Sequence, residues 1–581
     1  MNPTGEVIFP LTFATKRASA AAEVYLRDPP LRKLVEFFET KGLAAIKAED
    51  QSQTWHDDWI AYQAAHRLYA SVISTREYST LGNEFDLLRL TRFLEVFAYF
   101  SPAHGYSLQV SFLGLFAILM GTNAALKREA VAALEAGGLL AFGVSEKHHG
   151  SDLLGNELTV TATAPGRFVA AGSKYYIGNA NSASIIAVLG RRGSGNSSGA
   201  SKRAPPILFA LRPKKSEGFG NVRKIRTLGV RSAYVGAFDL KDHEFPQTDV
   251  LAEGRDAWEA VLGTVTLGKF FLGFGSIGIC ERALEESIDH LTRRILYGKP
   301  VIAMPHIASL VSQAYARLTA MKLYAYRALD YVQAASADDR RYLLFNAVQK
   351  AKVSTEGVKV IALLCECVGA WGFESENFFE MALRDIQLIP GLEGSTHINL
   401  ALTSQFIGRY FNQPSAELPT PASLAAGNLE SKENPYLMQA RGGSIHSIAF
   451  PPCLKAYRPW STVPNVRRFV KQIKAFGNFV KAGSPADAQT LGKCLATIAY
   501  GQLVAENCEV FQVPAPIVSA LFHCLVGDLS AAAFSIASWP GLEIRSRKLI
   551  RHAIVVPHTT AEEWDFVLNR ASAQGANFSR S

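Results

Sequence analysis

Residues 158–171 read Leu-Thr-Val-Thr-Ala-Thr-Ala-Pro-Gly-Arg-Phe-Val-Ala-Ala, which are two β-type runs joined by a Pro-Gly turn. Valine and threonine favour strands because their branched side chains pack well on a pleated surface. Similar short runs follow at 184–188 and 207–211. We therefore predict a compact β block over residues 139–250.

Helical periodicity flanks this block on both sides. Before it, Leu31, Leu34 and Phe38 mark an apolar stripe at helical spacing. After it, helical periods return and continue with interruptions over residues 256–573. Helices and strands are segregated along the chain, which favours an α+β fold over a doubly wound α/β sheet.

The composition is that of a globular protein. Hydrophobic residues make up 48% of the 581 residues and charged residues 19%, which excludes a disordered chain and a small disulfide-stapled scaffold. The longest apolar stretch, 112–120, is too short to span a bilayer, and the N-terminal residues do not resemble a secretory or mitochondrial signal. The seven cysteines form no Cys-x-x-Cys pair and are interpreted as buried thiols. We therefore expect a cytoplasmic protein.

The net charge of +9 is mild for this length and makes nucleic acid an unlikely partner. About half of the excess lies after residue 410. Residues 434–486 hold eight Lys/Arg and no Asp/Glu, and their centre, 466–481, has the pattern of an amphipathic helix with Asn465 as its N-cap. Such a helix can lie on an anionic membrane surface; the plainer interpretation is a bundle helix with a solvated basic face.

Residues 273–278 read Gly-Phe-Gly-Ser-Ile-Gly, a literal match to the dinucleotide-binding fingerprint. That fingerprint also needs a preceding strand and a second strand that ends in an acidic residue about 20 positions later. The preceding segment, 258–272, shows no alternation of apolar and polar residues, and a further helical pattern follows. We therefore interpret these glycines as part of a tightly packed helix.

Residues 142–152, Phe-Gly-Val-Ser-Glu-Lys-His-His-Gly-Ser-Asp, lie where helices give way to strands. Small residues, hydroxyls and a loop glycine let backbone N–H groups approach a polar or anionic cofactor closely. Gly-Ser-Asp is also common turn chemistry. His148 and His149 are adjacent and do not chelate one ion together, so we predict no metal site.

Glu393 lies between Leu392 and Gly394, after a Pro-Gly turn and before a helical pattern that starts at Ser395. Desolvation in an apolar setting would raise the pKa of this carboxyl group and make it a useful base. An acid at a helix N-terminus that complements the helix dipole explains the same pattern. The residues alone leave both interpretations open.

Taken in order, segments between about residues 105 and 410 resemble the acyl-CoA dehydrogenase family. The matching segments are Ser-Glu at 145–146 with Gly-Ser-Asp at 150–152, Lys-Tyr-Tyr-Ile-Gly-Asn at 174–179, Leu-Gly-Val-Arg at 228–231 with Phe-Pro at 245–246, Arg-Ile-Leu-Tyr-Gly-Lys-Pro at 294–300, Gly-Ala-Trp-Gly-Phe at 369–373, Arg-Asp at 384–385 and Glu-Gly-Ser-Thr at 393–396. Each segment is weak evidence alone, and together they are specific. The resemblance is vague before residue 105 and absent after residue 410.

The resemblance implies an N-terminal helical domain, a central β domain and a C-terminal four-helix bundle, with FAD as the cofactor. We accordingly expect four parts, at 1–138, 139–250, 251–410 and, as an additional helical domain, 411–581. Larger relatives, namely very-long-chain dehydrogenases, acyl-CoA oxidases and DNA-associated adaptive-response flavoproteins, also add a C-terminal helical domain.

The resemblance also implies roles for single positions. Glu393 would be the base that takes the α proton of an acyl thioester while hydride passes to flavin N5, which gives a trans-2-enoyl product. Relatives that place the base on an earlier helix have it where this chain has Gly268, followed by Lys269. The positions implied to bind FAD are Phe142, Val144, Ser145, Gly150, Ser151, Tyr176, Gly178, Arg294, Tyr297, Glu366, Gly369, Ser395 and His397, with Arg294 and Tyr297 reaching the FAD of a neighbouring subunit. The positions implied to line the substrate are Ser151, Leu392 and Gly394.

This sequence departs from the family pattern at four places. Gly178 replaces the hydroxyl residue that faces flavin N5, and Glu366 replaces a glutamine near the ADP part. The pair 147–148 replaces Pro-Gly, and the pair 305–306 replaces Phe-Gln at the subunit contact. These departures bear on cofactor geometry and assembly, and none removes the implied base.

Three functional classes stay open. A dehydrogenase would pass electrons to an electron-transfer flavoprotein, an oxidase would make hydrogen peroxide, and a non-enzymatic flavoprotein would bind nucleic acid. Glu393 favours the first two classes. The implied partners are an acyl-CoA or acyl-carrier thioester and further copies of the chain in a homodimer or homotetramer. The sequence does not give the acyl chain length or the carrier.

Overall fold

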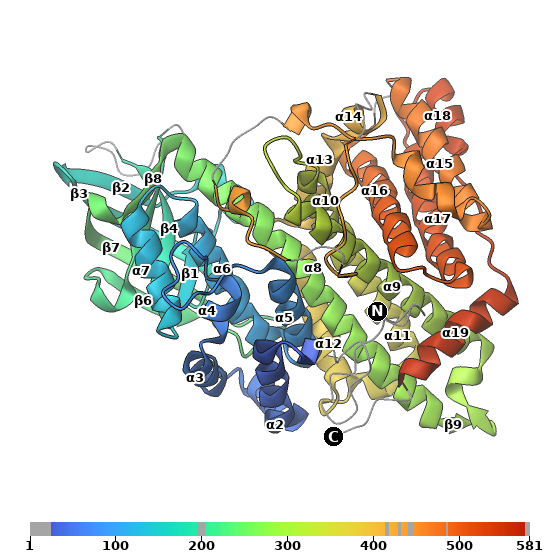
Figure 1. The fold of residues 1–581 in the computed structure, drawn as a ribbon, viewed down its shortest axis with the longest axis horizontal. Helices are drawn as coiled ribbons and strands as arrows, with labels where there is room; N and C mark the ends of the chain where they lie inside the picture. The colour runs from blue at the N-terminus through green and yellow to red at the C-terminus, as the bar shows by residue number, and fades with distance from the viewer. Residues whose placement is uncertain are drawn as a thin grey trace.

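The computed structural model describes residues 25–193, 204–412, 418–427, 431–439, 445–483 and 486–575. Helices come first along the chain, a sheet follows, and helices make up the rest (Figure 1). The α+β fold expected from the sequence is confirmed. The domain boundaries stay a prediction, although the strands of the main sheet lie between Leu139 and Glu253.

The described N-terminal helices surround one buried helix, α6. Their bounds are α2 (Pro29–Ser52), α3 (Asp57–His66), α4 (Leu68–Ile73), α5 (Leu87–Phe100), α6 (Pro102–Leu119) and α7 (Ala124–Glu135). Helix α6 is apolar on nearly all sides and packs between β1 and α8. A Cβ atom at Gly114 would lie 2.7 Å from the backbone nitrogen of Ala141, so only glycine lets α6 approach β1 this closely.

The main sheet has eight strands: β1 (Leu139–Gly143), β2 (Thr159–Ala164), β3 (Arg167–Gly178), β4 (Ala183–Arg192), β5 (Pro206–Leu211), β6 (Phe219–Lys224), β7 (Val235–Pro246) and β8 (Val250–Glu253). Seven strands follow the order β6-β7-β3-β2-β4-β5-β8, and β1 pairs with β4 in parallel. The last residue of β3, Gly178, pairs with Val235 of β7. Backbone atoms of Ser145 and Tyr175 are hydrogen-bonded, which joins the segment after β1 to the end of β3.

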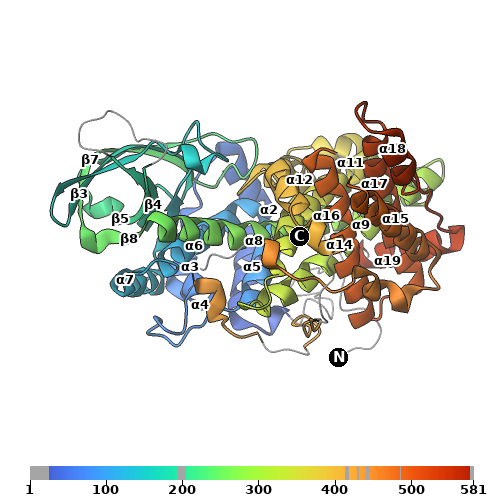
Figure 2. The same ribbon diagram turned by 90° about the horizontal axis from the view of Figure 1, so that it is seen from above.

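Helix α8, with 40 residues, runs from the sheet to the opposite end of the molecule (Figure 2). The elements of this region are α8 (Gly254–Arg293), β9 (Ile295–Leu296), β10 (Lys299–Pro300), α9 (Pro305–Gln333), α10 (Tyr342–Val348), the π-helical turn η6 (Gln349–Val353), α11 (Ser354–Val368), α12 (Phe378–Leu388), α13 (Thr396–Ser404) and α14 (Ile407–Asn412). The glycine run 273–278 lies inside α8, and a Cβ atom at Gly278 would lie 2.1 Å from the carbonyl oxygen of Glu95. The interpretation as packed-helix glycines is confirmed.

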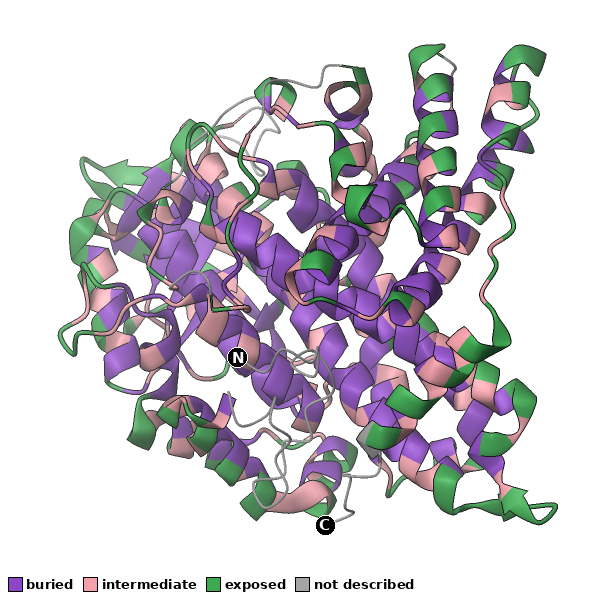
Figure 3. Cartoon of the chain, turned by 45° about the vertical axis from the view of Figure 1, so that its right-hand side comes forward, coloured by how far each residue is buried: buried purple, intermediate pink, exposed green. Residues whose placement is uncertain are grey.

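The C-terminal region adds five helices: α15 (Pro464–Lys481), α16 (Ala488–Val510), α17 (Ala515–Ala537), α18 (Ile544–Arg551) and α19 (Ala561–Gly575). Helix α16 packs on α13 and α9, and α19 packs on α8 and α9, so this region lies against the bundle (Figure 1). Buried segments run without interruption from the sheet through the bundle, and exposed residues gather at the outer ends of the helices (Figure 3).

One expectation about this region needs correction. Helix α15 begins at Pro464 with Val463 as its N-cap, and Asn465 lies inside the helix, where its amide donates to the carbonyl oxygen of Ser519 at 2.9 Å. By length and composition, α8 and α17 are apolar enough to cross a bilayer. In each of these helices 67% of the apolar window is buried inside the protein.

The cysteine interpretation agrees with the structure. All seven thiols are free, six of them are buried, and Cys365 is partly exposed.

Candidate active site

Glu393 lies in the loop that joins α12 to α13. This loop begins with a short 3₁₀ turn, η8 (Ile389–Gly391), and the Leu392 N–H donates to the Ile389 carbonyl oxygen. Glu393 has a φ angle of +47° and Gly394 one of +86°, both in the left-handed region. A left-handed glutamate is uncommon and costs free energy, so the surrounding contacts must hold it there. The loop therefore presents the Glu393 side chain in one fixed direction, toward α6 and α8.

The Glu393 carboxyl group is buried between these two helices. The amide nitrogen of Gln109 donates to Oε1 at 2.9 Å and to the Gly268 carbonyl oxygen at the same distance. Oε2 is buried and has no hydrogen-bond partner within the described residues. A Cβ atom at Gly268 would lie 2.5 Å from Oε2, so the glycine provides the space that the carboxyl group occupies. Gly268 therefore forms the wall beside the Glu393 carboxyl group.

Burial determines the protonation of this group. Desolvation raises the pKa of Glu393 to about 7, against the lowering effects of the Gln109 hydrogen bond and the charge of Lys350. Burial, followed by the charge of Glu393, also raises the pKa of Tyr106, which lies on α6 one turn before Gln109. A carboxyl group with a pKa near 7 and a free, buried oxygen can accept a proton from a bound molecule at neutral pH.

The ends of β1 and β3 form an edge next to this carboxyl group. The Ser145 hydroxyl donates to the Tyr175 carbonyl oxygen at 2.7 Å, which holds the segment after β1 against β3. Phe142 lies in β1 and Val144 directly after it, and Tyr176 has a φ angle of +61° with 55% of its surface exposed. This arrangement leaves the Tyr176 ring uncovered beside a backbone edge.

Gly178, at the end of β3, packs closely against side chains of α6, the helix that also contacts Glu393. A Cβ atom at Gly178 would lie 2.5 Å from Val110 Cγ2 and 2.7 Å from Tyr106 Cε1. The α6 side chains thus fill the space that a side chain at position 178 would need. This close packing agrees with glycine at the position where the resemblance implies a hydroxyl residue.

The loop after Ser145 is held by one buried ion pair. Lys174 Nζ lies 2.8 Å from Glu146 Oε1, and the backbone N–H groups of Glu157 and Leu158 also donate to this carboxylate. Gly150 and Ser151 are exposed, and nothing lies within 4 Å of a Cβ atom built at Gly150. The backbone at Gly150 is therefore open to close approach by a ligand.

One grouping in this loop was missed by the sequence analysis. Ligand atoms of Glu146, His149 and Glu157 lie within 4.8 Å of one another, which is metal-binding distance. The Glu146 oxygens already accept from an ammonium and two N–H groups. These bonds, together with 75% exposure of the Glu157 side chain, explain the grouping without an ion.

The remaining candidate positions divide into two sets. Ser395 and His397 lie at the start of α13 beside Glu393, and their side chains are 3.0 Å apart. Arg294, Tyr297, Glu366 and Gly369 lie instead at the far end of α8, where His290 of α8 stacks on Trp371. The structure therefore does not bring this second set to the chain's own Glu393.

Three residues around Glu393 were missed by the sequence analysis: Tyr106, Gln109 and Lys350. The Gln109–Glu393 hydrogen bond joins positions 284 residues apart. No local pattern identifies such a contact, since it depends on how α6 and α8 pack. The three residues became visible as part of the site only in the folded chain.

Comparison with known proteins matches part of the chain to one family. Residues 256–407 match the family described as Acyl-CoA dehydrogenase, C-terminal domain. An acyl-CoA dehydrogenase of Bacillus subtilis (strain 168) is 23% identical over 387 residues, covering 65% of this chain and 97% of the relative.

Two solved structures show how far the fold is shared. Butyryl-CoA dehydrogenase from Megasphaera elsdenii aligns with a TM-score of 0.60 and 20% identity over 66% of this chain and 98% of its own. An acyl-CoA dehydrogenase complexed with FAD from Bacillus anthracis aligns with a TM-score of 0.71 and 15% identity over 99% of this chain and 98% of its own. The second alignment includes the C-terminal region, where sequence motifs were absent. The match over residues 256–407 supports the acyl-CoA dehydrogenase family, and the fold, including the additional C-terminal helical region, is similar to that of these solved dehydrogenases.

Proposed function

We propose that this protein catalyses the FAD-dependent α,β-dehydrogenation of an acyl thioester, with Glu393 as the base. One observation carries the proposal: a buried carboxyl group whose Oε2 has no partner among the described residues and whose pKa is raised to about 7. Such a group is poised to take a weakly acidic proton at neutral pH. Similarity to named acyl-CoA dehydrogenases supports the same reaction.

The edge formed by β1 and β3 fits an FAD cofactor. Phe142, Val144 and Ser145 would line one side of the flavin ring, and the exposed Tyr176 ring would pack against it. The open backbone at Gly150 and the Ser151 hydroxyl would contact the pyrophosphate. Bound FAD would supply the acceptor for the two electrons removed from the substrate.

The residues of the chain would position the substrate and move one proton. Gln109 holds Oε1, which leaves Oε2 to take the α proton of the thioester. The Glu393 backbone N–H would donate to the thioester carbonyl and stabilise negative charge that develops there. Leu392, Gly394 and Ser151 would contact the acyl group and its carrier, and the N–H of Gly178 would face the flavin.

The Glu393→Gln variant tests the assignment of the base. We expect the variant to fold and to keep its yellow FAD, because glutamine has the size of glutamate. It should lose at least about 1,000-fold in the rate of anaerobic flavin bleaching by acyl-CoA, since no carboxylate remains to take the proton. Bleaching at the wild-type rate would disprove the role of Glu393. Glu376→Gln, at an exposed position, is the matched control and should bleach normally.

The same titration separates the functional classes. A dehydrogenase stays bleached until an electron-transfer flavoprotein is added, whereas an oxidase is recoloured by air and releases hydrogen peroxide. A flavoprotein that only binds nucleic acid ignores acyl-CoA at every chain length, and its DNA affinity falls steeply with salt. The buried base favours the first two outcomes.

We also propose that the protein is a homodimer or a homotetramer. Tyr297 is 92% exposed at the tip of the β9–β10 hairpin, beside the exposed Ile295. Apolar side chains this exposed at a hairpin tip are typical of a surface that another chain covers. A second copy would bring Arg294 and Tyr297 to the FAD of its neighbour, which the chain's own fold does not do. Light scattering of the Tyr297→Ser variant should report a loss of association.

The C-terminal region presents a basic surface for which we propose contact with anionic lipid. Arg467, Lys471, Lys474 and Lys481 form one exposed stripe on α15. Helix α18 packs beside α15 and adds three exposed basic residues and Ile544, which is 76% exposed. The two helices lie at the upper right of Figure 1, on the side of the molecule away from the sheet. Clustered cations with an exposed apolar side chain match a membrane surface.

Flotation with phosphatidylserine-containing vesicles tests this surface. We expect the wild type to float in moderate salt and the Lys471→Glu/Lys474→Glu variant to stay in solution. Lys214→Glu/Lys215→Glu makes the same change of net charge at exposed positions on the β domain and should float. Equal flotation of both double variants, or no flotation of the wild type, would disprove the proposal.

A further inference from the structure

Lys350 is a completely buried lysine beneath the loop that carries Glu393. It lies in the π-helical turn η6, between α10 and α11. Its Nζ donates to the Ile389 carbonyl oxygen at 2.5 Å, and the Leu392 N–H donates to the same oxygen at 3.3 Å. The ammonium therefore braces the turn immediately before Glu393, where the backbone enters the left-handed region.

The π-helical turn explains how a lysine reaches this place. Such turns insert one residue into a helix and occur often at functional sites. Here the turn contains two lysines with different partners: Lys350 contacts the Glu393 loop, whereas Lys352 pairs with Asp528 of α17. One short segment thus contacts both the candidate active site and the C-terminal region.

Glu393 is the carboxylate that acts on Lys350. Burial lowers the pKa of Lys350 to about 7, the charge of Glu393 raises it, and the charge of Lys269 on α8 lowers it. In return, the charge of Lys350 lowers the pKa of Glu393. Besides Lys269, Tyr106 of α6 is a titratable group that interacts with Glu393. No ion pair to a carboxylate within 4.0 Å is formed by Lys350 in the described part of the chain.

A buried ammonium group without a contacting anion costs free energy, so we expect the lysine at this position to have a specific function. We propose that Lys350 is a positioning residue that braces the Ile389–Leu392 turn and favours the ionised form of Glu393 through its charge. The inference rests on the proposed function for its catalytic meaning. The charge of Lys350 opposes the desolvation of Glu393, so part of the base is ionised at neutral pH although its carboxyl group is buried.

Two substitutions separate the hydrogen bond from the charge. Lys350→Gln keeps a donor for the Ile389 carbonyl and removes the charge, whereas Lys350→Met removes both. Lys350→Arg keeps the charge and serves as the conservative rescue. Lys241→Met is the matched control, because this lysine is exposed on β7 and lies outside the charge network of Glu356 and Asp528.

The first readout does not depend on turnover. The pKa of Glu393 is measured by ¹³C-carboxyl NMR titration of glutamate-labelled protein, with the signal assigned by its loss in Glu393→Gln. We expect Lys350→Gln and Lys350→Met to raise this pKa by at least about one unit, and Lys350→Arg to restore it. Lys241→Met should leave it unchanged. If Lys350→Gln titrates like the wild type, the proposal is wrong, and this conclusion holds even if Lys350→Met does not fold.

The second readout is the pH profile of anaerobic flavin reduction. A rise of one unit from about 7 would lower the ionised fraction of Glu393 at pH 7 about fivefold, and the rate should fall equally and recover at higher pH. A pH-independent loss of rate would contradict an electrostatic role. If the wild type reduces no flavin with any acyl-CoA, the proposed function fails, while the NMR titration still decides the role of Lys350.

Discussion

At the scale of the residue, two features of Glu393 are unfavourable for the stability of the folded protein. Its φ angle of +47° is unfavourable for a side chain, and its carboxyl group is buried with one oxygen unpartnered among the described residues. The carboxyl group is held by a hydrogen bond from Gln109, by the space beside Gly268 and by the charge of Lys350. These contacts do not fully offset the free-energy cost of its burial, because its pKa stays raised. Residues that are costly for stability are typical of catalytic sites.

This cost predicts a stability that depends on pH. The pKa of Glu393 is raised from 4.5 to about 7 by folding, so its protonated form favours the folded state below pH 4.5, and this contribution is lost as the pH rises to about 7. The loss amounts to about 3 kcal/mol. Glu393→Gln does not titrate and should therefore be more stable than the wild type at pH 8, with little difference at pH 5.

Thermal unfolding at pH 5, 6, 7 and 8 measures this effect. The gap in Tm between Glu393→Gln and the wild type should open as the pH rises. A gap that stays constant with pH would show that the carboxyl group is ionised in the folded protein throughout. Glu376→Gln, at an exposed position, should show no gap.

At the scale of the element, one close helix contact joins the C-terminal region to the helix after Glu393. A Cβ atom at Gly492 of α16 would lie 2.1 Å from the Leu400 carbonyl oxygen of α13. Gln489 of α16 also donates to the His397 carbonyl oxygen at 2.9 Å. Helix α16 therefore fixes α13, and with it the C-terminal side of the Glu393 loop.

Two glycine substitutions test this contact. Gly492→Ala should destabilise the protein by about 1–3 kcal/mol, because the backbones of α13 and α16 must move apart. Gly527→Ala on α17 is the matched control: nothing lies within 4 Å of a Cβ atom there, so alanine should stabilise the helix by up to about 1 kcal/mol. Urea unfolding measures both. Equal effects of the two substitutions would contradict the close approach of α13 and α16.

Features that depend on local sequence could be predicted, whereas contacts between distant residues could not. The basic stripe of α15 follows from a local period, and the glycine run in α8 was correctly interpreted because the dinucleotide fingerprint needs neighbouring strands that are missing. Asn465 was assigned as a cap because capping rules use local sequence, whereas its amide bonds Ser519, 54 positions away. Gln109 and Lys350 escaped prediction for the same reason. Motif order supplied the fold and the candidate base, and packing supplied its neighbours.

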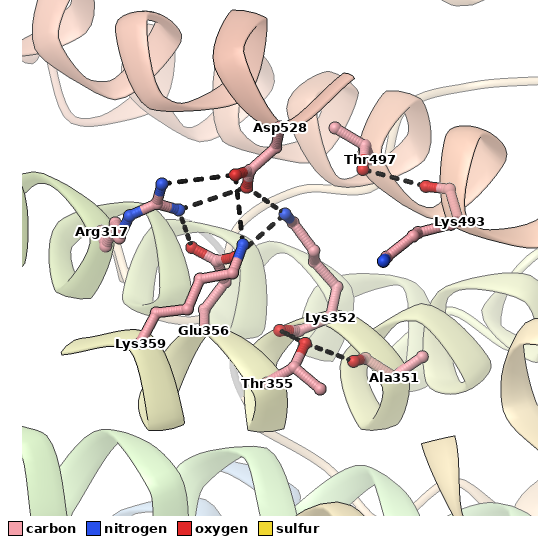
Figure 4. A network of polar contacts seen from close by, with 9 residues as sticks. All are labelled: Arg317, Ala351, Lys352, Thr355, Glu356, Lys359, Lys493, Thr497 and Asp528. Carbon is pink, nitrogen blue, oxygen red and sulfur yellow. Dashed lines mark hydrogen bonds and ion pairs between the residues drawn. The ribbon is translucent and has the colours of Figure 1, made fainter. Parts of the chain in front are cut away.

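At the scale of the whole molecule, a buried network of charges attaches the C-terminal region to the bundle (Figure 4). Asp528 of α17 pairs with Arg317 of α9 and with Lys352 and Lys359, and Glu356 of α11 pairs with the same three cations. These cations hold the pKa of Asp528 well below its usual range. The network therefore keeps its charges at neutral pH and joins two regions that are distant in sequence.

Removal of the Asp528 charge should weaken the attachment of the C-terminal region to the bundle. Asp528→Asn would leave Arg317, Lys352 and Lys359 with Glu356 as their shared carboxylate in this network, and breaking a buried ion pair from one side costs about 3–5 kcal/mol. We expect a lower Tm and faster proteolysis of the C-terminal region. Asp565→Asn, at an exposed position on α19, is the matched control and should unfold like the wild type.

Lys352 lies in the same π-helical turn as Lys350, so a loosened network should also weaken the contact between Lys350 and the turn before Glu393. If Asp528→Asn lowers the Tm but leaves the Glu393 titration unchanged, the active site is independent of the C-terminal region; a raised Glu393 pKa would show that the two are coupled through this turn.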